Sequence, residues 1–442
     1  MIPIAYSAYI TTINHLRKHS NADRLQVATI FGNDVIVDLS YEIGQRVIYF
    51  PTDGQLGKEF AYENNLVRLK DANGNNTGGY LDPDKRNIKA INLRGEKSDG
   101  LVLPIEVLAK YTNIDDLKDG DQITTLGGVE ICRKYIPRGN NRNHRHDTGF
   151  ATKKNQKEEK QEITYPNFTE HIDTEQLAYN ESAFRQGDII YLTRKLHGTS
   201  FRVSNTLEFT TKRRHPFVKR VFHIKDKTTS KYQIVSGTRR VVLRDYDGGY
   251  YGSNQFRKKY NDFFVGKLPK GMTVYGEIVG WIDEKTPIMP KCSNSKIKDK
   301  SFSRTYGDET IFTYGCAPGE NHCYIYRITM TNEDGVTVEL PTEETIKWCE
   351  RLGCEYVPLL GKFLYTTWED LNERVSKYLD LPEPLANGTH ISEGVVVRID
   401  NRSKFTAYKA KGFMFKMISG IAVENLKDKE IDNMNEDILS EI

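Results

Sequence analysis

The sequence predicts an α+β protein, with a small N-terminal β-barrel followed by a larger domain built on antiparallel sheets. Its 442 residues exceed one comfortable hydrophobic core, so two domains are expected. The first hundred residues alternate short apolar runs with tight turns, and from about residue 167 apolar strands return, interrupted by helical segments. A basic stretch that is poor in apolar residues separates the two parts.

Four N-terminal strands are expected where apolar and polar residues alternate, at residues 8–13, 25–30, 35–38 and 46–50. Gly32-Asn33-Asp34 is typical of a tight turn between two of them. Short strands with turns at this spacing favour a barrel, which we expect to occupy residues 1–132.

Residues 133–166 are expected to form a flexible basic linker, because such a composition buries too little apolar surface to fold alone. Its charge run either attracts nucleic-acid phosphates or is simply a solvated tether. The second domain is expected over residues 167–420, with helices at 343–352 and 368–379. Apolar residues spaced among acidic ones predict an acidic amphipathic helix at 421–442, more typical of docked packing than of a partner site.

The composition limits the class of protein. Apolar residues make up 38% and charged residues 28%, and the formal net charge is +3, so the chain is no polycation. Any nucleic-acid contact must therefore come from local basic patches. No apolar run approaches a membrane span, and residues 1–5 lack the basic start and apolar core of a signal peptide, so a cytoplasmic protein is expected.

The six cysteines contain no CxxC pair, and disulfides are unusual in the cytoplasm. Two interpretations remain open for them: buried free thiols, or a zinc site in which some of them converge with a histidine. The candidates for that site are irregularly spaced, namely Cys316, His322, Cys323, Cys349 and Cys354.

Lys195 stands in the run Thr-Arg-Lys-Leu-His-Gly-Thr-Ser at residues 193–200. A lysine attacks phosphorus only as the neutral amine, so a nucleophilic lysine needs nearby cations or a bound metal that disfavour the ammonium form. Candidate cations recur at 239–240 and 409–411, and candidate metal-binding carboxylates stand at Glu277 and Glu393. Such an inventory is typical of a site that handles polyphosphates.

None of these motifs is specific alone, but their order along the chain is. The ordered set comprises Lys195, Gly198, Arg239, Glu277, the strand 324–327, Glu393, Lys409 and Lys411. This set resembles the nucleotidyltransferase motifs of covalent ligases and capping enzymes. Residues 19–25 and 91–101 also resemble motifs of OB-fold barrels. With an OB-type domain in front, the chain is most similar to the ATP-dependent RNA ligases of the Deinococcus and Naegleria type, from Tyr6 to about Met417.

The resemblance implies that Lys195 attacks the α-phosphorus of ATP and carries AMP. Lys409 and Lys411, expected on one face of a strand, would neutralise the α-phosphate while pyrophosphate departs. Thr193 and Gly198 would lie against the nucleotide, the glycine because a Cβ would crowd it.

Arg239 would contact the nucleotide sugar and the incoming phosphate end, since a guanidinium binds phosphate through a bidentate fork. We expect it within a strand over 236–243, which makes residues 207–232 an inserted basic hairpin. The rival candidates lie closer to the lysine in the sequence and are Lys212, Arg213 and Arg214.

Glu277 and Glu393 are the expected metal-associated carboxylates, because hard oxygen ligands suit Mg²⁺ or Mn²⁺ beside substrate phosphates. Glu393 is the stronger candidate, and Glu277 would act through waters or the ribose; strand-end salt bridges are the alternative for both. Tyr326 would stack on the adenine, although Tyr324 lies one strand period away and either one could be a core tyrosine.

Two residues depart from the family pattern. His197 stands where much of the family has an aspartate, which leaves the role of that aspartate open. Arg194 stands where close relatives often place a glutamate that recognises the adenine amino group. We nevertheless count Arg194 among the residues expected around the nucleotide.

The sequence thus predicts an RNA ligase that uses ATP and Mg²⁺ or Mn²⁺ to join 3′-hydroxyl and 5′-phosphate RNA ends, with RNA as partner, no membrane and a monomeric state. One alternative is a non-catalytic RNA-binding protein with a degenerate transferase domain. The others are a DNA ligase and a GTP-using capping enzyme, which would ordinarily place the OB domain after the catalytic domain.

Overall fold

The computed structural model describes residues 6–136, 161–212, 226–248, 251–297 and 299–425. Most of the predicted linker, the tip of the predicted hairpin with Arg213 and Arg214, and most of the predicted C-terminal helix lie outside these ranges. The fold is a mixed α/β structure, rich in strands and with few helices, as the sequence predicts. No helix in the described part is long and apolar enough to cross a membrane.

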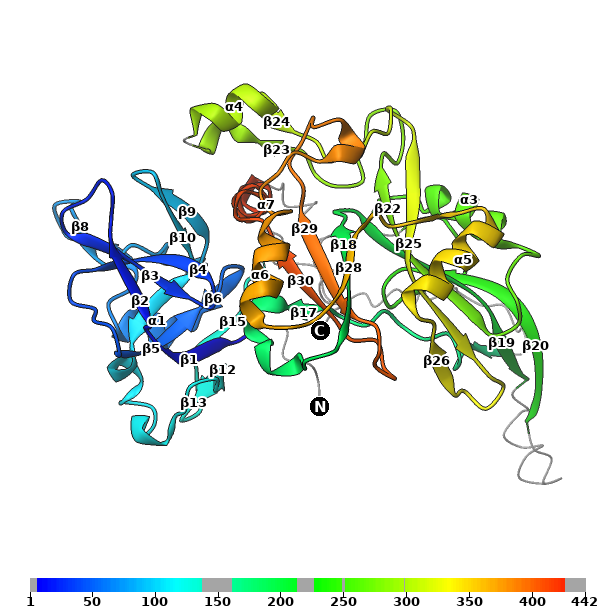
Figure 1. Cartoon of the computed structure of the whole chain (residues 1–442), viewed down its shortest axis with the longest axis horizontal. Coiled ribbons are helices and arrows are strands. Elements are labelled where there is room, and N and C mark those ends of the chain that lie inside the picture. Colours follow the sequence, from blue (N-terminus) through cyan, green and yellow to red (C-terminus); the bar gives the residue numbers. More distant parts are fainter. Residues whose placement is uncertain (1–5, 137–160, 213–225, 249–250, 298, 426–442) are drawn as a thin grey trace.

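The N-terminal strands pair in several short sheets (Figure 1). The largest has the order β11-β5-β1-β12, and β2-β3-β4 form a three-stranded sheet. Within residues 6–136 this pairing gives no closed barrel, so only the coarse fold class is confirmed. The strands are β1 (Ala8–Thr12), β2 (His15–Lys18), β3 (Leu25–Ile30), β4 (Asn33–Asp38), β5 (Arg46–Phe50), β6 (Gly54–Leu56), β7 (Arg68–Lys70), β8 (Asn76–Gly78), β9 (Ala90–Leu93), β10 (Glu96–Asp99), β11 (Leu101–Pro104), β12 (Gln122–Ile123), β13 (Thr125–Leu126), β14 (Val129–Glu130) and β15 (Cys132–Lys134).

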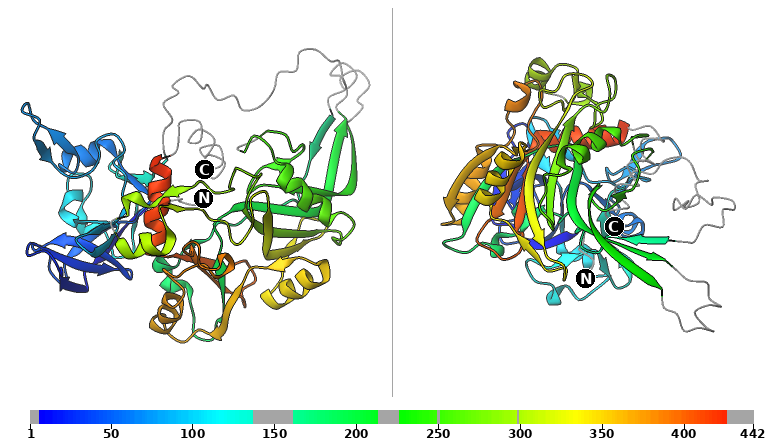
Figure 2. Two further views of the ribbon diagram at one scale, coloured as in Figure 1. Left: turned by 90° about the horizontal axis from the view of Figure 1, so that it is seen from above. Right: turned by 90° about the vertical axis from the view of Figure 1, so that its right-hand side faces the viewer.

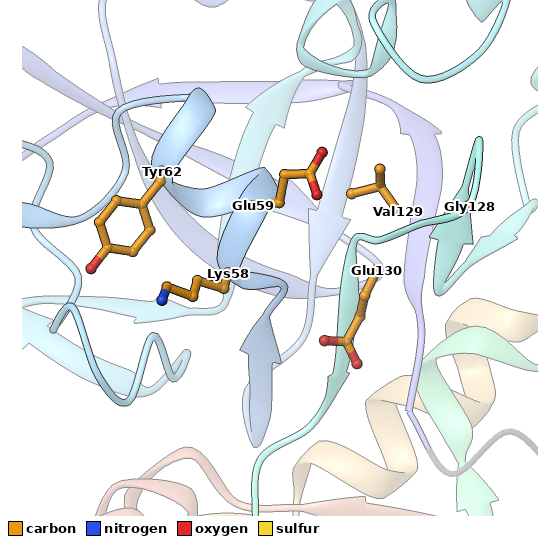
Figure 3. A pocket seen from close by; sticks show the side chains of 6 residues that line it. All are labelled: Lys58, Glu59, Tyr62, Gly128, Val129 and Glu130. Carbon is orange, nitrogen blue, oxygen red and sulfur yellow. The ribbon is translucent and has the colours of Figure 1, made fainter.

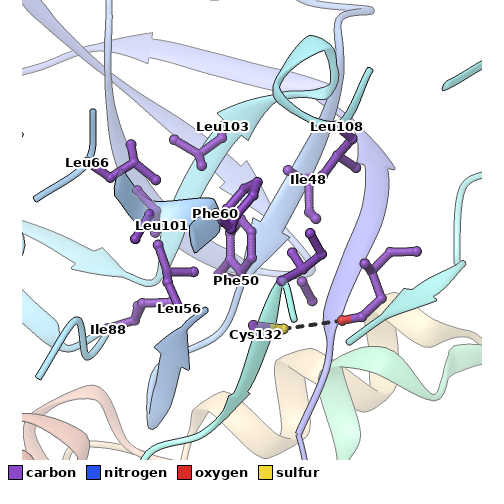
Figure 4. Packing of buried hydrophobic residues seen from close by; sticks show 14 of the residues in the cluster. Ile48, Phe50, Leu56, Phe60, Leu66, Ile88, Leu101, Leu103, Leu108 and Cys132 are labelled. Carbon is purple, nitrogen blue, oxygen red and sulfur yellow. Dashed lines mark hydrogen bonds between the residues drawn. The ribbon is translucent and has the colours of Figure 1, made fainter. Parts of the chain in front are cut away.

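The N-terminal unit has its own hydrophobic core. Phe50 of β5 and Phe60 of helix α1 (Lys58–Glu63) are fully buried there, with ring centroids 6.0 Å apart (Figure 4). On its outer side, α1 and the β13–β14 turn border a hollow of about 520 Å³ lined by Lys58, Glu59 and Glu130 (Figure 3). None of the predicted site residues lines this hollow.

The C-terminal part is built on two sheets. The larger has the order β21-β20-β19-β22-β25-β26, with β16 paired to β19 and β27 to β25. Its long β19–β20 hairpin pairs Leu207 with Tyr232, so the predicted insertion is confirmed as a hairpin (Figure 2). The strands are β16 (Gln161–Thr164), β19 (Thr199–Lys212), β20 (Lys227–Gly237), β21 (Val242–Leu243), β22 (Met272–Gly280), β25 (Asn321–Thr331), β26 (Thr337–Glu339) and β27 (Glu355–Tyr356).

The smaller sheet has the order β17-β30-β29-β18-β28, and the short strands β23 and β24 pair separately. These strands are β17 (Glu175–Gln176), β18 (Ile189–Lys195), β23 (Cys292–Ser293), β24 (Glu309–Thr310), β28 (Leu359–Leu364), β29 (Gly394–Ile399) and β30 (Ala407–Lys411). The helices of this part are α3 (Gln255–Phe264), α4 (Lys300–Tyr306), α5 (Thr342–Leu352), α6 (Trp368–Ser376) and α7 (Phe413–Asn425). Helices α5 and α6 confirm the two helices predicted from the sequence.

Residues 196–198 carry the chain from β18 in the smaller sheet to β19 in the larger one. Leu196 is buried there in a core that also contains Val279 of β22 and Phe415 of α7. Lys195, the last residue of β18, therefore lies where the two sheets meet. We call this junction between the two sheets the seam, and the candidate site residues of both sheets lie along it.

Helix α7 lies between the N-terminal unit and the rest of the chain in both views (Figures 1 and 2). Lys416 of α7 donates to Asp99 at the end of β10, with 2.5 Å between Nζ and Oδ2. Tyr179 stacks on Tyr9 of β1 with ring centroids 4.4 Å apart. The N-terminal unit is thus packed against the helix that directly follows β30.

Two sequence expectations change. The predicted strand over 236–243 is wrong, because β20 ends at Gly237 and β21 folds back on it through a tight turn in which the Thr238 N–H donates to the Val241 carbonyl. All six cysteines are free, and the described residues contain no group of three metal-ligating side chains, which favours the buried thiols over a zinc site.

Candidate functional site

Lys195 and Lys411 face each other across a glycine. In the smaller sheet Lys195 pairs with Gly394, and Gly394 pairs with Lys411, so the three share one row and one face. Gly394 has a φ of +147°, and a Cβ there would collide with the carbonyl oxygen of Ala410. A glycine is needed at this point, and no side chain separates the two ammonium groups.

Glu393 holds both ammonium groups. Its Oε1 lies 2.9 Å from Nζ of Lys195 and 3.3 Å from Nζ of Lys411, and its side chain is only 1% exposed. Burial alone raises the pKa of this carboxyl, but Lys195, Lys411 and His197 together lower it to about 2. Glu393 is therefore charged at neutral pH and fixes two of the predicted catalytic residues.

Lys409 occupies the next row of the same face, opposite Val396, which in turn pairs with Thr193. Burial, followed by the charges of Lys411 and Lys195, lowers the pKa of Lys409 to about 7. The structure thus brings together the three predicted lysines and the buried Thr193 on one face, where an anion would relieve their mutual repulsion.

His197, which follows the nucleophile by two residues, is held on several sides. Its ring meets Phe312 and Phe415 edge to face, with centroids 4.8 and 4.9 Å away, and its backbone N–H donates to the hydroxyl of Tyr314 over 2.6 Å. The pKa of His197 is lowered to about 3. Burial is the main cause, and the nearby Lys411 and Lys195 add to it while Glu393 opposes it. The imidazole is therefore neutral at neutral pH.

Glu277 reaches the same seam from β22. Its Oε1 accepts from the backbone N–H of Gly198 over 3.2 Å. Burial raises its pKa to about 7, and Glu393 acts in the same direction, while Lys195 opposes it. Gly198 packs against the backbone of Ile278, so the structure explains this glycine by strand packing as well as by the predicted contact with a nucleotide.

Tyr326 is presented by an irregularity in β25. The β22–β25 pairing shifts register between Tyr275 and Gly276, which leaves Tyr326 without an opposite residue. Such bulges re-aim a side chain and are frequent beside active sites. Tyr326 is hydrogen-bonded to His171 and lies within electrostatic range of Glu277, whereas Tyr324 is buried in the core.

Arg239 lies on the turn between β20 and β21. Beneath that turn the fully buried guanidinium of Arg202 donates to the carbonyls of Thr238 and Arg240, over 3.0 and 3.1 Å. Asp173 forms an ion pair with Arg239. Arg239 also contributes to lowering the pKa of Lys409, so the structure brings it close to the lysines.

Arg194 is the predicted residue that the structure does not bring together with the others. It pairs with Val395, which in turn pairs with Ala410, and this row is one position out of step with Lys195, so the Arg194 side chain lies on the opposite face of the sheet. There it is buried, donates to Oγ of Ser392 over 2.9 Å and lies 3.4 Å from Glu383. The rival Lys212, at the far end of β19, also lies away from this cluster.

The cluster joins a lysine at a strand end, two more lysines, an arginine on a turn, the buried carboxylate of Glu393 and the half-buried carboxylate of Glu277. Such a face binds phosphate groups, and the carboxylates lie where a divalent cation would balance additional phosphate charge. A model of the RNA ligase family matches residues 188–418, a segment that contains this entire cluster. The chain belongs to the RNA ligase family.

Several solved structures of variants of Naegleria gruberi RNA ligase have a similar fold. One with AMP and manganese shares 17% identity, with a TM-score of 0.55, over 92% of this chain and 97% of that one. One with ATP and manganese shares 17% identity, with a TM-score of 0.53, over 94% and 98%. An apo form shares 18% identity, with a TM-score of 0.55, over 96% and 100%. A search of curated proteins finds no match.

The carboxylates of this family member fit a divalent cation in part. Oε2 of Glu393 is buried and has no hydrogen-bond partner among the described residues. The same residues contain no group of three or more side chains able to hold a metal. A cation here would therefore take its remaining ligands from water and substrate phosphates, as Mg²⁺ commonly does.

Several residues of the site were not predicted from the sequence. Tyr314 is 3% exposed, has a left-handed φ of +51° and supports the loop after Lys195. Arg202 and His171 support Arg239 and Tyr326. None of them belongs to a motif, and the only available signal was a polar residue placed within an apolar strand, as at Arg202.

Proposed function

We propose that this chain is an ATP-dependent RNA ligase that joins 3′-hydroxyl and 5′-phosphate ends through a lysyl-AMP intermediate at Lys195. The observation that carries the proposal is the shared carboxylate: Lys195 and Lys411 both contact Oε1 of Glu393, with Lys409 in the adjacent row. Three half-buried lysines on one face favour anionic substrate groups. The descriptions of the Naegleria structures name AMP, ATP and pyrophosphate, which supports a nucleotide as that substrate.

In the first step the neutral amine of Lys195 attacks the α-phosphorus of ATP. A P–N bond forms, the bond to pyrophosphate breaks, and the amine gives up its proton. Lys409 and Lys411 bind the α-phosphate, and their positive charge stabilises the charge that develops on phosphorus.

In the second step an oxygen of the RNA 5′-phosphate attacks the AMP phosphorus, the P–N bond breaks, and Lys195 leaves as the amine and takes up a proton. The 5′ end then carries AMP through a pyrophosphate bond. In the third step the 3′-hydroxyl loses its proton to water as its oxygen attacks the 5′-phosphorus, the phosphorus–oxygen bond to AMP breaks, and AMP departs as the leaving group. Arg239, anchored by Arg202, is suited to bind the incoming phosphate.

Glu393 and Glu277 are the residues that would hold a divalent cation, Mg²⁺ or Mn²⁺. When bound, such a cation neutralises phosphate charge and lowers the barrier to displacement. Tyr326 would stack on the adenine. Thr193 and Gly198 would lie along the nucleotide. Arg194 lies on the opposite face of the sheet, so it would not touch the nucleotide and would only help to hold β18 in place.

For the rest of the chain we propose an OB-type nucleic-acid-binding domain over 1–132, a basic linker over 133–166, a nucleotidyltransferase domain over 167–420 and a terminal helix over 421–442. The N-terminal unit would hold RNA beside the seam, since it packs against α7, which directly follows β30. The enzyme is expected to act as a cytoplasmic monomer.

Incubation with α-³²P-labelled ATP and Mg²⁺ tests the proposal. Wild-type protein is expected to form a covalent, acid-labile AMP adduct, which Lys195→Ala abolishes. The surface variant Lys377→Ala, at a residue that is 62% exposed and directly follows α6, is the matched control and should keep the adduct. A labelled adduct on Lys195→Ala refutes the assignment, and RNA binding without any adduct in wild type supports the non-catalytic alternative.

Sealing of nicked duplexes then separates RNA from DNA ligation. Two substrates differ only in whether the strand that supplies the 3′-hydroxyl is RNA or DNA. An RNA ligase is expected to require the terminal 2′-hydroxyl, because this group is what distinguishes the two nucleic acids at one site. Equal sealing of both substrates would contradict the proposal.

A further inference from the structure

Glu393 has one oxygen that the described residues do not satisfy. Its Oε1 is shared by Lys195 and Lys411. Its Oε2 is buried and has no hydrogen-bond partner in the part of the chain that the structure describes. Leaving a buried charged oxygen without a partner is costly, so such an atom is expected to meet a ligand in the working enzyme.

His197 lies beside this oxygen. Its Nδ1 lies 4.0 Å from Oε2 of Glu393, too far for a hydrogen bond. The edge-to-face contacts with Phe312 and Phe415 fix the ring, and the hydroxyl of Tyr314 fixes the backbone of the same residue. The ring is therefore held in one orientation with Nδ1 toward the carboxylate, as a preorganised ligand requires.

We propose that Nδ1 of His197 and Oε2 of Glu393 together ligate the divalent cation of this site and bias it toward Mn²⁺ over Mg²⁺. The inference rests on the proposed function, because substrate phosphates and water must complete the coordination. Metal–nitrogen and metal–oxygen bonds of about 2.0 to 2.2 Å span up to about 4.2 Å, so two atoms 4.0 Å apart leave room for one ion.

The bias follows from the chemistry of the two donors. Mg²⁺ prefers oxygen ligands and gives up its waters reluctantly, whereas affinity for imidazole rises from Mn²⁺ along the first transition series. An aspartate, which much of the family has at this position, supplies only oxygen. The imidazole of His197 thus places a nitrogen donor beside the carboxylate of Glu393.

Pulsed electron paramagnetic resonance tests this directly. The full-length protein is mixed with Mn²⁺ and the unreactive analogue α,β-methylene-ATP, and ¹⁴N modulation of the Mn²⁺ echo is recorded. We expect a directly bound histidine nitrogen, whose signal changes when the protein is labelled with ¹⁵N-histidine. His197→Asp should lose this coupling, while His322→Gln, a histidine variant outside the site, should keep it.

Competition between the two metals gives the second readout. Mg²⁺ is titrated against bound Mn²⁺, and the free Mn²⁺ signal is followed. The preference of wild type for Mn²⁺ should fall about tenfold in His197→Asp, because the imidazole donor is lost. Absence of histidine coupling in wild type that forms lysyl-AMP overturns the metal assignment alone, as does coupling that persists in His197→Asp. Absence of the lysyl-AMP adduct overturns the proposed function instead.

Discussion

The two faces of the smaller sheet at β18 carry similar residues in different electrostatic states. On one face Glu393 is 1% exposed and meets Lys195 and Lys411 at 2.9 and 3.3 Å; on the other, Glu383 is fully buried and meets Arg194 at 3.4 Å. The pKa of Glu393 is lowered to about 2. Burial raises the pKa of Glu383, because the single guanidinium of Arg194 does not offset the cost of burying the charged carboxylate.

The difference shows that burial alone does not decide the charge of a carboxylate. Two lysines and a histidine around Glu393 outweigh desolvation, whereas one arginine beside Glu383 does not. The first face therefore keeps a negative charge at neutral pH that holds two ammonium groups in place, which suits a reaction centre. The second face forms a closed polar pair that stabilises the sheet behind it.

The largest expected effect comes from neutralising the active face. Glu393→Gln keeps the shape but removes the charge that fixes both lysines, so the rate of lysyl-AMP formation should fall about 100-fold or more. Single-turnover labelling with ATP measures it. Glu383→Gln is the matched change on the other face and should keep the rate within about threefold; similar losses in both variants would erase the contrast between the faces.

Gly394→Ala tests the row between the two lysines. A Cβ at this φ strains the backbone and meets the carbonyl of Ala410, which should cost about 2 kcal/mol of stability and displace Lys411. Thermal unfolding and the adenylation rate should both decline. Val396→Ala, in the neighbouring row, provides the comparison, and a Gly394→Ala protein with wild-type melting would show that the row tolerates a side chain.

Arg194→Met tests the opposite face. Removing the guanidinium leaves Glu383 and Ser392 without their buried partner, so stability should fall by about 1.5 kcal/mol. Adenylation at saturating ATP should persist, because the side chain lies behind β18. We expect a lower melting temperature and an unchanged single-turnover rate. A selective loss of ATP affinity would instead show that Arg194 contacts the nucleotide.

The smallest effect is a pH dependence from Glu277. Its pKa rises from 4.5 in the unfolded chain to about 7, so folding favours the protonated form and its contribution to stability is lost as pH increases from 4.5 through 7. Relative to Glu277→Gln, wild type should lose about 1 kcal/mol between pH 5 and 6. Melting curves at both pH values measure it, with Glu355→Gln as an exposed control.

Much of the site was predictable because its residues lie in local patterns. Glu277 stands alone as an acid in a continuous apolar run, and this local pattern marks both the acid and the strand β22 that carries it. The shared face of Lys409 and Lys411 likewise follows from the two-residue period of a strand. The turn at Arg239 was missed because the apolar residues 241–243 favoured one continuous strand over 236–243.

By itself the sequence determined which chemical groups are present and in what order: the nucleophilic Lys195 candidate, the two acids, the lysine pair and the strands that carry them. Only the tertiary structure decided which groups meet. The row from Lys195 through Gly394 to Lys411, the place of Arg194 on the far face and the support of His197 by Tyr314 all depend on pairing between distant segments. Register between such segments is set by packing over the whole sheet, so local patterns cannot specify it.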